Sequence, residues 1–416
     1  MTRMRKLAPV AAALLLVAGA ALAVILYREH AGRDVRGSST VEFVTTAVPE
    51  PRRLGAIAWP TFGFDGGRLH VAPPSRLRPP FRVDWVAGGR TLLEFPPAIA
   101  FRRLYLANYA GDLMAVSTRT GARAWTFRTG RCAAASPAIG TYRHGTVYET
   151  FLGRRPCDSK SAADGEVVAV SAGTGELRWR RRIGPSETSP LLVGTRLYVG
   201  DWRGRVYCLR AGTGRLVWTF QAGGAVKGAL AVSDGRLYVG AYDGHVYALD
   251  ARTGRLVWRA SGDARLLGGH GTFYSTPAVA YGRVYIGSTD GKVYSFGARS
   301  GRRRWSYSTG GYVYGSPAVW RRRVLVGSYD HSFYALDAAT GALLWRFRAN
   351  GPISGSATVI DGVVYFATLE GRTYALDART GRKLWSFPDG RYTPVVTDGR
   401  RLYLLGYAKI YRLSPR

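Results

Sequence analysis

The sequence predicts an all-β protein: an eight-bladed β-propeller of four-stranded antiparallel blades that follows an N-terminal transmembrane helix. Three observations lead to this prediction: a recurring phrase, a strand-and-turn pattern between its copies, and an apolar run near the N-terminus. The phrase is clearest at residues 248–258, which read Ala-Leu-Asp-Ala-Arg-Thr-Gly-Arg-Leu-Val-Trp. Its copies end at Trp125, Trp179, Trp218, Trp258, Trp305, Trp345 and Trp385, at intervals of 54, 39, 40, 47, 40 and 40 residues. A period near 40 indicates one supersecondary unit per repeat, stacked on its neighbours.

The apolar run covers residues 7–26 and follows the basic residues Arg3, Arg5 and Lys6. A helix of this length spans about 30 Å, the thickness of the hydrocarbon core of a bilayer. Basic residues before such a run favour a cytoplasmic tail at residues 1–6 and an extracytoplasmic remainder, as in a single-pass signal-anchor. The alternative is a secreted protein, cleaved after Ala23 at a small-residue signal-peptidase site.

Residues 27–57 are polar and punctuated by Pro, and we expect them to form a linker to a propeller domain at 58–416. Residues 275–310 illustrate one blade. Its four strands are predicted at 275–279, 284–287, 293–296 and 304–307, with Gly-containing turns between them. One such sheet cannot bury both of its faces, and radial stacking of the sheets solves this problem.

The Trp residues are interpreted as structural docking groups. Each indole is expected to lie against the backbone of the next blade, near the small residue, usually Ala, that opens the phrase. The Gly after Thr or Ser can adopt the positive φ that a tight turn needs. The predicted docking residues are Trp85 together with the seven Trp residues that end the phrase.

The end of the chain indicates how the ring closes. An eighth repeat begins at Tyr392 and reaches Leu413, but the chain stops before a fourth strand. Residues 81–86 have the fourth-strand pattern, and their Trp85 lies one period before Trp125. We therefore predict that this N-terminal strand completes the C-terminal blade and closes the propeller.

The phrase Ala-x-Asp-x-x-Thr-Gly-x-x-x-Trp resembles the tryptophan-docking repeat of pyrroloquinoline-quinone (PQQ) type propellers. The lead-in at residues 59–63, Trp-Pro-Thr-Phe-Gly, followed by Pro79, Pro80 and Phe81, resembles the opening segment of such proteins. The resemblance covers roughly residues 58–416. It implies the propeller fold, but not one activity, because the family contains quinoprotein dehydrogenases as well as non-catalytic scaffolds such as the BamB-like outer-membrane assembly lipoproteins.

The dehydrogenase branch implies adjacent cysteines beside the quinone and a calcium ion held by carboxylate and Asn side chains. The three cysteines of this chain are not adjacent, and Asn108, one of its two Asn residues, is expected in a turn. We therefore assign no catalytic, cofactor-binding or metal-binding residue, and we expect no cofactor. The lipid-bearing Cys of the BamB-like lipoproteins is also missing. The alternative is a PQQ-dependent alcohol or sugar oxidoreductase, or a quinone-binding protein, with PQQ and calcium as cofactors.

The turns of a four-stranded meander sort onto two faces of the disc. Turns between the first and second strands and between the third and fourth strands share one face, here named the arginine face because Arg is frequent in them, as at Arg236 and Arg252. The whole chain has a formal net charge of +32, and a face rich in Arg fits an anionic envelope polymer or lipid surface. The alternative is a solvated surface that binds nothing specific. Few aromatic residues lie between the basic residues, so nucleic acid is not an expected partner.

The second-to-third turns and the links between blades share the other face, here named the link face. An insertion around residues 153–164 places Cys157 on this face, near Cys132 in the preceding link. We predict a disulfide between Cys132 and Cys157, which would stabilise the fold by roughly 3 kcal/mol in the chain-entropy model. Cys208 takes a small-residue position of a third strand, and we expect it to be a buried, inert thiol.

A second insertion at residues 266–273 also lies on the link face. Together with the following links it contributes possible binding residues, namely His270, Phe273, Tyr274, Tyr312 and Tyr314. Aromatic loops around a central funnel are typical of binding sites, although packing explains them equally well. The sequence thus favours a monomeric, membrane-anchored, extracytoplasmic propeller that binds an envelope protein or polymer without catalysis.

Overall fold

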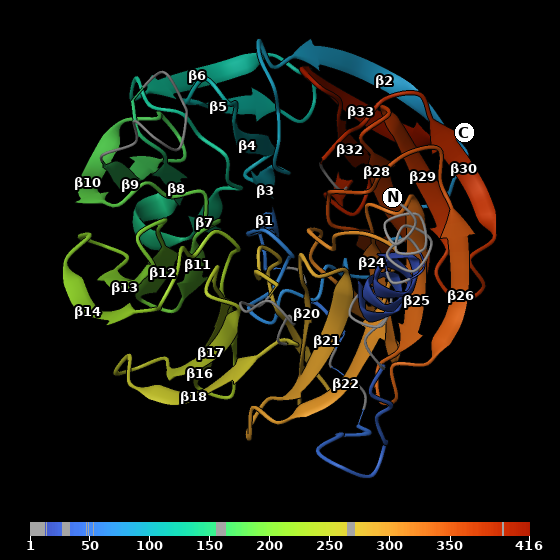
Figure 1. Cartoon of the computed structure of the whole chain (residues 1–416). Helices are drawn as coiled ribbons and strands as arrows, with labels where there is room; N and C mark the ends of the chain where they lie inside the picture. The colour runs from blue at the N-terminus through green and yellow to red at the C-terminus, as the bar shows by residue number, and fades with distance from the viewer. Residues whose placement is uncertain are drawn as a thin grey trace, which may run out of the picture.

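The computed structural model describes residues 13, 15–26, 34–46, 48, 50–52, 54–154, 164–263, 271–392 and 395–416. The described residues form eight antiparallel sheets arranged radially around a central axis (Figure 1). This confirms the predicted eight-bladed propeller. Each blade runs outward from a short, buried first strand to a long, exposed fourth strand, as the burial patterns of β19 and β26 illustrate.

The strands of blades 1 to 4 are, in order, β3 (Ala98–Ala100), β4 (Arg103–Ala107), β5 (Asp112–Ser117) and β6 (Arg123–Arg128); β7 (Ala138–Gly140), β8 (Thr146–Phe151), β9 (Gly165–Ser171) and β10 (Leu177–Ile183); β11 (Leu191–Val193), β12 (Arg196–Gly200), β13 (Arg205–Arg210) and β14 (Leu216–Gln221); and β15 (Ala231–Ser233), β16 (Arg236–Gly240), β17 (His245–Asp250) and β18 (Leu256–Ser261). A short extra strand, β1 (Ile57–Trp59), pairs with the inner edge of blade 1 at β3. A 3₁₀ turn, η1 (Tyr142–His144), lengthens the first-to-second turn of blade 2.

The strands of blades 5 to 8 are β19 (Ala278–Ala280), β20 (Arg283–Gly287), β21 (Lys292–Gly297) and β22 (Arg303–Ser308); β23 (Ala318–Trp320), β24 (Arg323–Gly327), β25 (Ser332–Asp337) and β26 (Leu343–Arg348); β27 (Thr358–Ile360), β28 (Val363–Thr368), β29 (Arg372–Asp377) and β30 (Lys383–Phe387); and β31 (Val396–Thr397), β32 (Leu402–Leu405), β33 (Lys409–Pro415) and β2 (Phe81–Gly88). In blade 5 the first strand begins three residues later than the sequence predicts, at Ala278.

Blade 8 closes the ring with strands from both ends of the chain. Strand β2 pairs antiparallel with β33 from Phe81↔Pro415 to Gly88↔Lys409, and Figure 1 shows the blue strand beside the red ones. The predicted closure by residues 81–86 is therefore confirmed. Asp84 adds an ionic contact at this seam, because its carboxylate lies 3.2 Å from Arg412 Nε and 3.3 Å from Arg401 Nε.

Indole side chains join successive blades. The indole nitrogen donates to a backbone carbonyl of the next blade in the following pairs: Trp85 to Thr118 (3.3 Å), Trp125 to Ala172 (3.1 Å), Trp179 to Ala211 (2.9 Å), Trp218 to Ala251 (3.2 Å), Trp258 to Ala298 (3.1 Å) and Trp305 to Ala338 (2.9 Å). The acceptor follows the third strand. It differs from the Ala that opens the phrase, which pairs across the sheet with the Trp of its own blade, as Ala248 does with Trp258.

The segment 59–72 fills the central channel and is here named the plug. It bonds to the inner strands of successive blades, for example from Ile139 N to Pro60 O, from Val232 N to Gly66 O and from Val319 N to Leu69 O. Arg68 is completely buried inside the disc, where its guanidinium donates to Leu230 O, Phe62 O and Thr61 Oγ1. The plug therefore ties most of the blades together from the inside.

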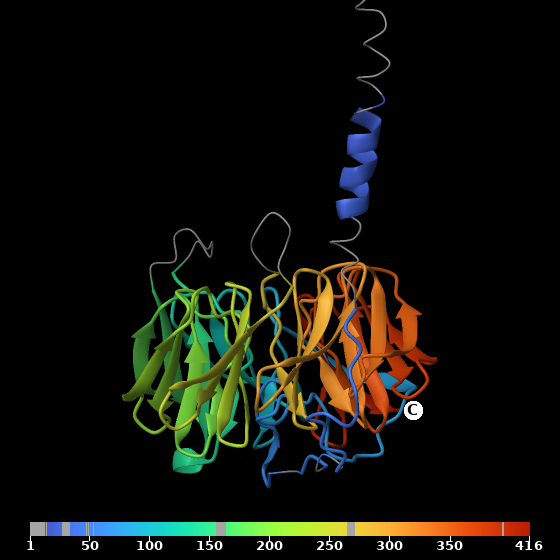
Figure 2. The same cartoon turned by 60° about the horizontal axis from the view of Figure 1, so that its bottom comes forward.

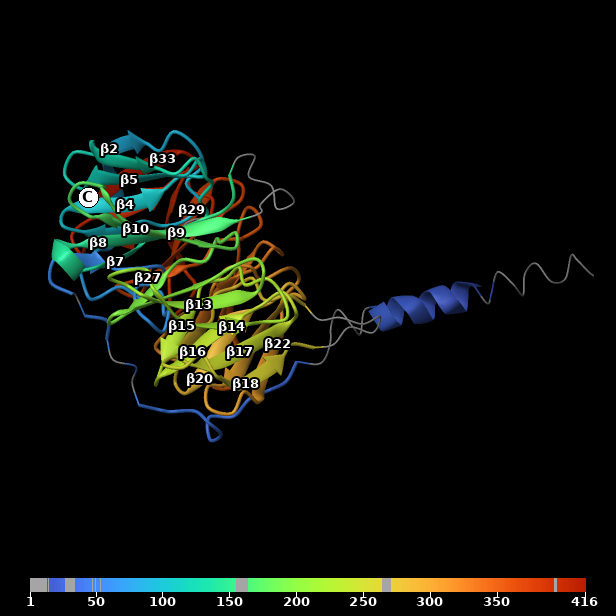
Figure 3. The ribbon, with the colours of Figure 1, turned by 90° about the vertical axis from the view of Figure 1, so that its left-hand side faces the viewer.

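Residues 34–44, here named the strap, run along the outside of the disc. Asp34 accepts hydrogen bonds from Ser308 at the link-face end of β22, whereas Glu42 pairs with Arg304 near the arginine face. Arg283 donates to Glu42 O, and Phe43 stacks on Tyr281 with ring centroids 5.3 Å apart. Figure 3 shows the strap as the blue trace along the edge of the disc. The described part of the predicted linker 27–57 is therefore bound to the propeller.

Residues 15–26 form a helix with exposed apolar side chains, such as Leu16 and Val17. Figure 2 shows this helix apart from the disc, on the side of the link face. Residues 1–12, 14 and 27–33 lie outside the described part. None of the helices among the described residues combines the length and the hydropathy needed to cross a membrane.

Candidate functional site

The candidate site is a funnel at the centre of the link face, above the plug. Phe62 of the plug contributes to its lining, and the rest comes from the links that lead into the first strands, with residues such as Glu187, Lys227 and Tyr274. The cavity in the funnel measures about 70 Å³. Because the plug occupies the channel below it, the funnel is a closed depression in the disc.

Two charged groups, Lys227 and Glu187, form an ion pair in the funnel. Lys227 Nζ lies 3.3 Å from Glu187 Oε1 and is 4.2 Å and 5.1 Å from the ring centroids of Trp202 and Tyr242. The Trp202 indole also donates to Glu187 Oε1 at 2.9 Å. The ammonium group of Lys227 is therefore held between two aromatic rings and a carboxylate, an arrangement in which cation–π attraction adds to the ion pair.

Burial makes the two carboxylates of the funnel weaker acids. Burial and, to a smaller extent, the nearby charge of Glu187 raise the pKa of Glu94 to about 7. Burial also raises the pKa of Glu187, although the Lys227 ammonium and the donated hydrogen bonds oppose this shift. At neutral pH Glu94 can therefore be present as the carboxylic acid and donate a hydrogen bond.

A ring of hydroxyl groups forms part of the funnel wall. Four of them accept a hydrogen bond from a backbone amide of the preceding blade: Ser189 from Ser136, Thr276 from Ala229, Ser316 from Thr276, and Ser356 from Ser316, at 2.9 to 3.1 Å. These contacts link blade 2 to blade 3 and join blades 4 to 7 in succession, which helps to fix the shape of the wall.

The structure brings together three of the five predicted binding residues. Tyr274 packs edge-on against Tyr314, whose ring is also close to Tyr312, with centroids 5.3 Å and 5.7 Å apart. Tyr312 is half exposed at the surface. Phe273 instead points into the core and packs against Tyr294, while His270 lies outside the described residues.

The cysteines are only partly described. Cys132 is disulfide-bonded, whereas Cys208 is a free, fully buried thiol at the position expected from the sequence. Cys157 lies outside the described residues. The pairing of Cys132 with Cys157 therefore stays a prediction.

Glu94, Glu187 and Lys227 were missed by the sequence analysis. They lie in links of irregular sequence, and their positions in the funnel depend on how the blades are arranged around the axis. One signal was present: Glu187 and Lys227 are charged residues in links that are otherwise rich in small and apolar residues. A charged residue in such a link points to the funnel only once the ring is known.

The funnel does not fit a quinone with calcium. Calcium takes six to eight oxygen ligands, and among the described residues no group of three or more His, Cys, Asp or Glu side chains is placed to hold a metal ion. The cavity of about 70 Å³ is far below the roughly 300 Å³ at which small-molecule pockets begin. The side chain of Asn108 accepts a hydrogen bond from Asp112 N within its own turn and donates one to Gly89 O, which follows β2.

Comparison with solved structures shows a shared fold. The BamB structure from Moraxella catarrhalis has a TM-score of 0.63 at 19% identity and covers 81% of this chain and 98% of that one. The quinohemoprotein alcohol dehydrogenase from Comamonas testosteroni has a TM-score of 0.70 at 14% identity, over 86% and 80% of the two chains. A europium-containing methanol dehydrogenase has a TM-score of 0.69 at 12% identity, over 87% and 98%. Scaffolds and enzymes thus share this architecture.

Comparison of sequences is more selective. BamB from Shewanella oneidensis is 25% identical over 154 residues, which amount to 33% of this chain and 36% of that protein. The chain thus matches about a third of the length of this curated relative. The family model described as outer membrane protein assembly factor BamB matches residues 163–313 and 309–409, more than half of the chain. The chain therefore belongs to the BamB family of PQQ-like propellers.

Proposed function

We propose that this protein is a non-catalytic scaffold of the cell envelope that binds other envelope proteins through its link face. The observation that carries this proposal is the filled channel, because the plug occupies the centre of the disc and leaves a funnel of about 70 Å³. A surface with a shallow depression and exposed aromatic rings suits a protein partner better than a small substrate. The name of the family, which refers to outer membrane protein assembly, supports the same function.

The protein partner would contact the aromatic residues around the funnel. Tyr312 is 50% exposed and lies next to Tyr314, and tyrosines of this kind are common in the centres of interfaces. Lys227 and Glu187 are paired within the funnel. A partner would therefore meet a surface with few free charges, surrounded by a polar rim.

The location in the cell follows from the N-terminal sequence. We propose that residues 7–26 anchor the protein in a membrane with residues 1–6 in the cytoplasm and the propeller outside, or that cleavage after Ala23 releases it. The strap begins at the link-face end of β22, where Asp34 bonds to Ser308. Because only residues 27–33 separate the strap from the anchor, the link face would lie toward the membrane and the arginine face away from it. An anionic partner of the arginine face would then be an envelope polymer, and the anchoring lipid would be out of reach.

The test is a pull-down from detergent-solubilised envelope, with the full chain as bait and a quantitative comparison of variants. We expect Tyr312→Ala to lose the captured protein and Tyr142→Ala, an equally exposed tyrosine of the arginine face, to retain it. Equal capture by both variants would contradict the use of the link face. A second arm adds PQQ and calcium and follows quinone absorbance and dye reduction with alcohols or aldose sugars, and stoichiometric uptake with turnover would overturn the scaffold function.

A further inference from the structure

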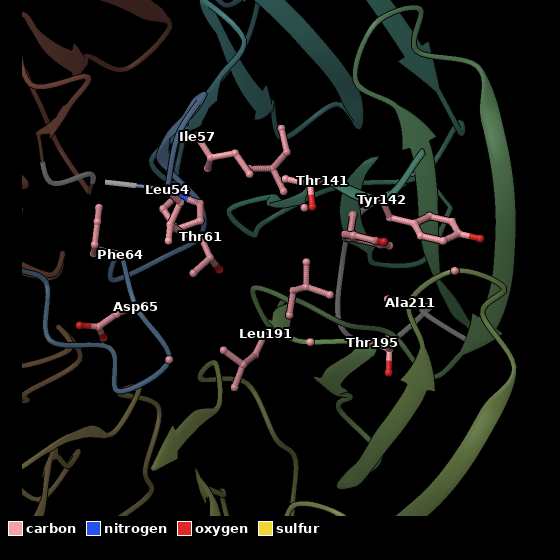
Figure 4. Close-up of a pocket in the computed structure, with 18 of the residues that line it drawn as sticks. Leu54, Ile57, Thr61, Phe64, Asp65, Thr141, Tyr142, Leu191, Thr195 and Ala211 are labelled. Carbon is pink, nitrogen blue, oxygen red and sulfur yellow. The ribbon is translucent and has the colours of Figure 1, made fainter. Parts of the chain in front are cut away.

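A larger pocket lies on the arginine face, on the opposite side of the disc from the funnel. It measures about 910 Å³ and lies between the plug and the first-to-second turns of blades 2 and 3 (Figure 4). Leu54, Ile57 and Phe64 lie at its inner end, whereas Tyr142 and Ala211 lie at its outer end. The volume is within the range of about 300–1,000 Å³ that is typical of small-molecule sites.

The outer end of the pocket contains a buried hydroxyl group without a partner. Tyr148 is fully buried and lines the pocket, and its hydroxyl makes no hydrogen bond within the described part of the chain. Burial raises the pKa of Tyr148 and the hydroxyl group of Thr146 lowers it, but this hydroxyl already donates to Tyr142 O and accepts from Arg178. A buried hydroxyl group without a hydrogen-bond partner is destabilising, so a ligand that accepts its hydrogen bond would be favoured.

The corresponding tyrosine is hydrogen-bonded in four other blades. Its counterparts donate to the carbonyl that follows the third strand of the next blade: Tyr105 to Ala172 (3.1 Å), Tyr198 to Ala251 (2.9 Å), Tyr238 to Ala298 (3.1 Å) and Tyr285 to Ala338 (3.0 Å). In blade 2 the corresponding acceptor, Ala211 O, receives the Trp179 indole at 2.9 Å, and no bond from Tyr148 accompanies it. The counterpart in blade 7, Tyr365, also lacks a hydrogen-bond partner within the described part of the chain, but of these two tyrosines only Tyr148 lines this pocket.

The recurring phrase also changes beside this pocket. Its third position is an acid in blades 4, 6 and 7, where Asp250, Asp337 and Asp377 accept hydrogen bonds from the Thr of the following turn. In blade 3 this position is Arg210, which is exposed and lines the outer end of the pocket. None of the other six copies has a basic residue there. The substitution exchanges a turn-stabilising acid for a cation at the pocket.

The charges of the pocket favour an anion. Arg210 and Arg52 line the pocket, and both are exposed. Asp65 is the one acidic residue among the lining residues; its Oδ1 accepts a hydrogen bond from Leu69 N, and burial raises its pKa to about 6. Asp65 is still mostly ionised at neutral pH, but it lies beside Phe64 at the inner end of the pocket (Figure 4). An anionic group at the outer end would thus meet the exposed guanidinium group of Arg210, with apolar walls behind it.

We propose that this pocket binds a single-chain anionic amphiphile, namely a long-chain carboxylate. Its alkyl chain would lie against Leu54, Ile57 and Phe64, and its carboxylate would accept hydrogen bonds from Arg210 and from the Tyr148 hydroxyl. The alkyl chain of such a ligand matches the apolar walls of the pocket. Its carboxylate supplies both the negative charge that matches Arg210 and the acceptor for the Tyr148 hydroxyl. This site is separate from the funnel and does not depend on the scaffold function.

The experiment measures binding of radiolabelled dodecanoate to the full chain in nanodiscs of zwitterionic phospholipid, with empty nanodiscs as the background. We expect saturable binding of dodecanoate at one site per chain, and at least tenfold weaker binding of dodecanol and of dodecyltrimethylammonium. Absence of saturable binding above the background would overturn the proposal. Equal affinity for all three amphiphiles would overturn it too, because the pocket would then recognise only the alkyl chain.

Four variants locate the site. Arg210→Asp restores the residue found in other blades, so it should preserve the turn and weaken dodecanoate binding at least tenfold. Tyr148→Phe should weaken it about threefold to tenfold, and Thr195→Trp, at the exposed mouth, should block it. The matched control Arg252→Asp removes an exposed Arg from the neighbouring blade and should leave affinity within twofold. Unchanged unfolding midpoints will show that each variant is folded, and unchanged binding by folded Arg210→Asp or Thr195→Trp would place the ligand elsewhere.

Discussion

Replacing Gly301 by Ala tests how tightly the indole groups join the blades. Gly301 has a φ of +68°, and a Cβ atom added to it would lie 2.7 Å from the Trp258 ring of the preceding blade. The positive φ costs roughly 1–2 kcal/mol for an L-residue with a side chain. The overlap costs about 1–3 kcal/mol more, because the Trp258 ring is held by its bond to Ala298 O and by Tyr238. The expected total is a loss of about 2–5 kcal/mol.

Gly235 provides the matched control. Its φ is +71°, but a Cβ atom there would meet no heavy atom within 4 Å. Gly235→Ala should therefore show the backbone cost alone, about 1–2 kcal/mol. Both variants can be compared with the wild type by guanidinium unfolding, followed through far-UV circular dichroism and Trp fluorescence. The difference between the two variants isolates the contact with the indole.

A double-mutant cycle completes this test. Trp258→Ala removes the ring and by itself should cost about 3–5 kcal/mol. In that background Gly301→Ala should cost no more than Gly235→Ala does, because the overlap no longer exists, and the cycle should show a coupling of about 1–3 kcal/mol. Equal effects of Gly301→Ala and Gly235→Ala in the wild-type background, or a coupling near zero, would refute the docking of Trp258 on Gly301.

Three further predictions concern the seam, the funnel and the disulfide. Asp84→Asn should cost about 1–3 kcal/mol, and less at high salt, because Arg412 and Arg401 lose their carboxylate; an equal loss in the exposed control Glu176→Gln would contradict this. Burial raises the pKa of Glu94 to about 7, so the folded protein must bury a carboxylate once the pH exceeds this value. The free energy of unfolding of the wild type should therefore fall by about 2–3 kcal/mol as pH rises from about 4.5 to 7. Glu94→Gln should therefore unfold at a higher temperature than the wild type at pH 8 but not at pH 4.5, and a pH-independent difference would count against this. Cys132→Ala should lower the free energy of unfolding by roughly 3 kcal/mol, and Cys208→Ala should lower it less. Peptide mapping without reductant should recover Cys132 joined to Cys157, and finding both thiols free would contradict the disulfide.

The repeated part of the fold could be predicted because each copy of the phrase has the same types of residue at the same positions. The Trp, the Gly that follows Thr or Ser, and the small residue across from the Trp recur with the period of one blade. In blades 1 to 7 this Gly lies against the indole ring of the preceding blade, although the indole nitrogen of Trp345 has no hydrogen-bond partner within the described residues. The seam was predictable for the same reason, since Trp85 lies one period before Trp125 and the last repeat lacks a fourth strand.

The positions of the plug and the strap could not be predicted from the repeated residues. Arg68 donates to Leu230 O, and Val44 N donates to Tyr281 O, so their partners are more than 150 residues away and share no pattern with them. A polar, Pro-rich segment such as the predicted linker has the composition of a tether, and this composition does not depend on whether the folded domain offers a surface that binds it. The conformation of these segments depends on contacts with the complete propeller, and the sequence near them contains no pattern that predicts those contacts.

The same limit explains why the candidate site was found only in part. The aromatic links were predicted because Tyr274, Tyr312 and Tyr314 lie in two successive links. Glu94 lies in the link before blade 1, and it comes near Glu187 only because the blades are arranged around a common axis. The plug also decides what this site can bind, since it fills the channel and contributes Phe62 to the lining of the funnel. A propeller with the same eight Trp residues and an open channel could hold a cofactor at this place. The function of such a chain therefore depends on the segment before the first blade, more than on the repeats that define its family.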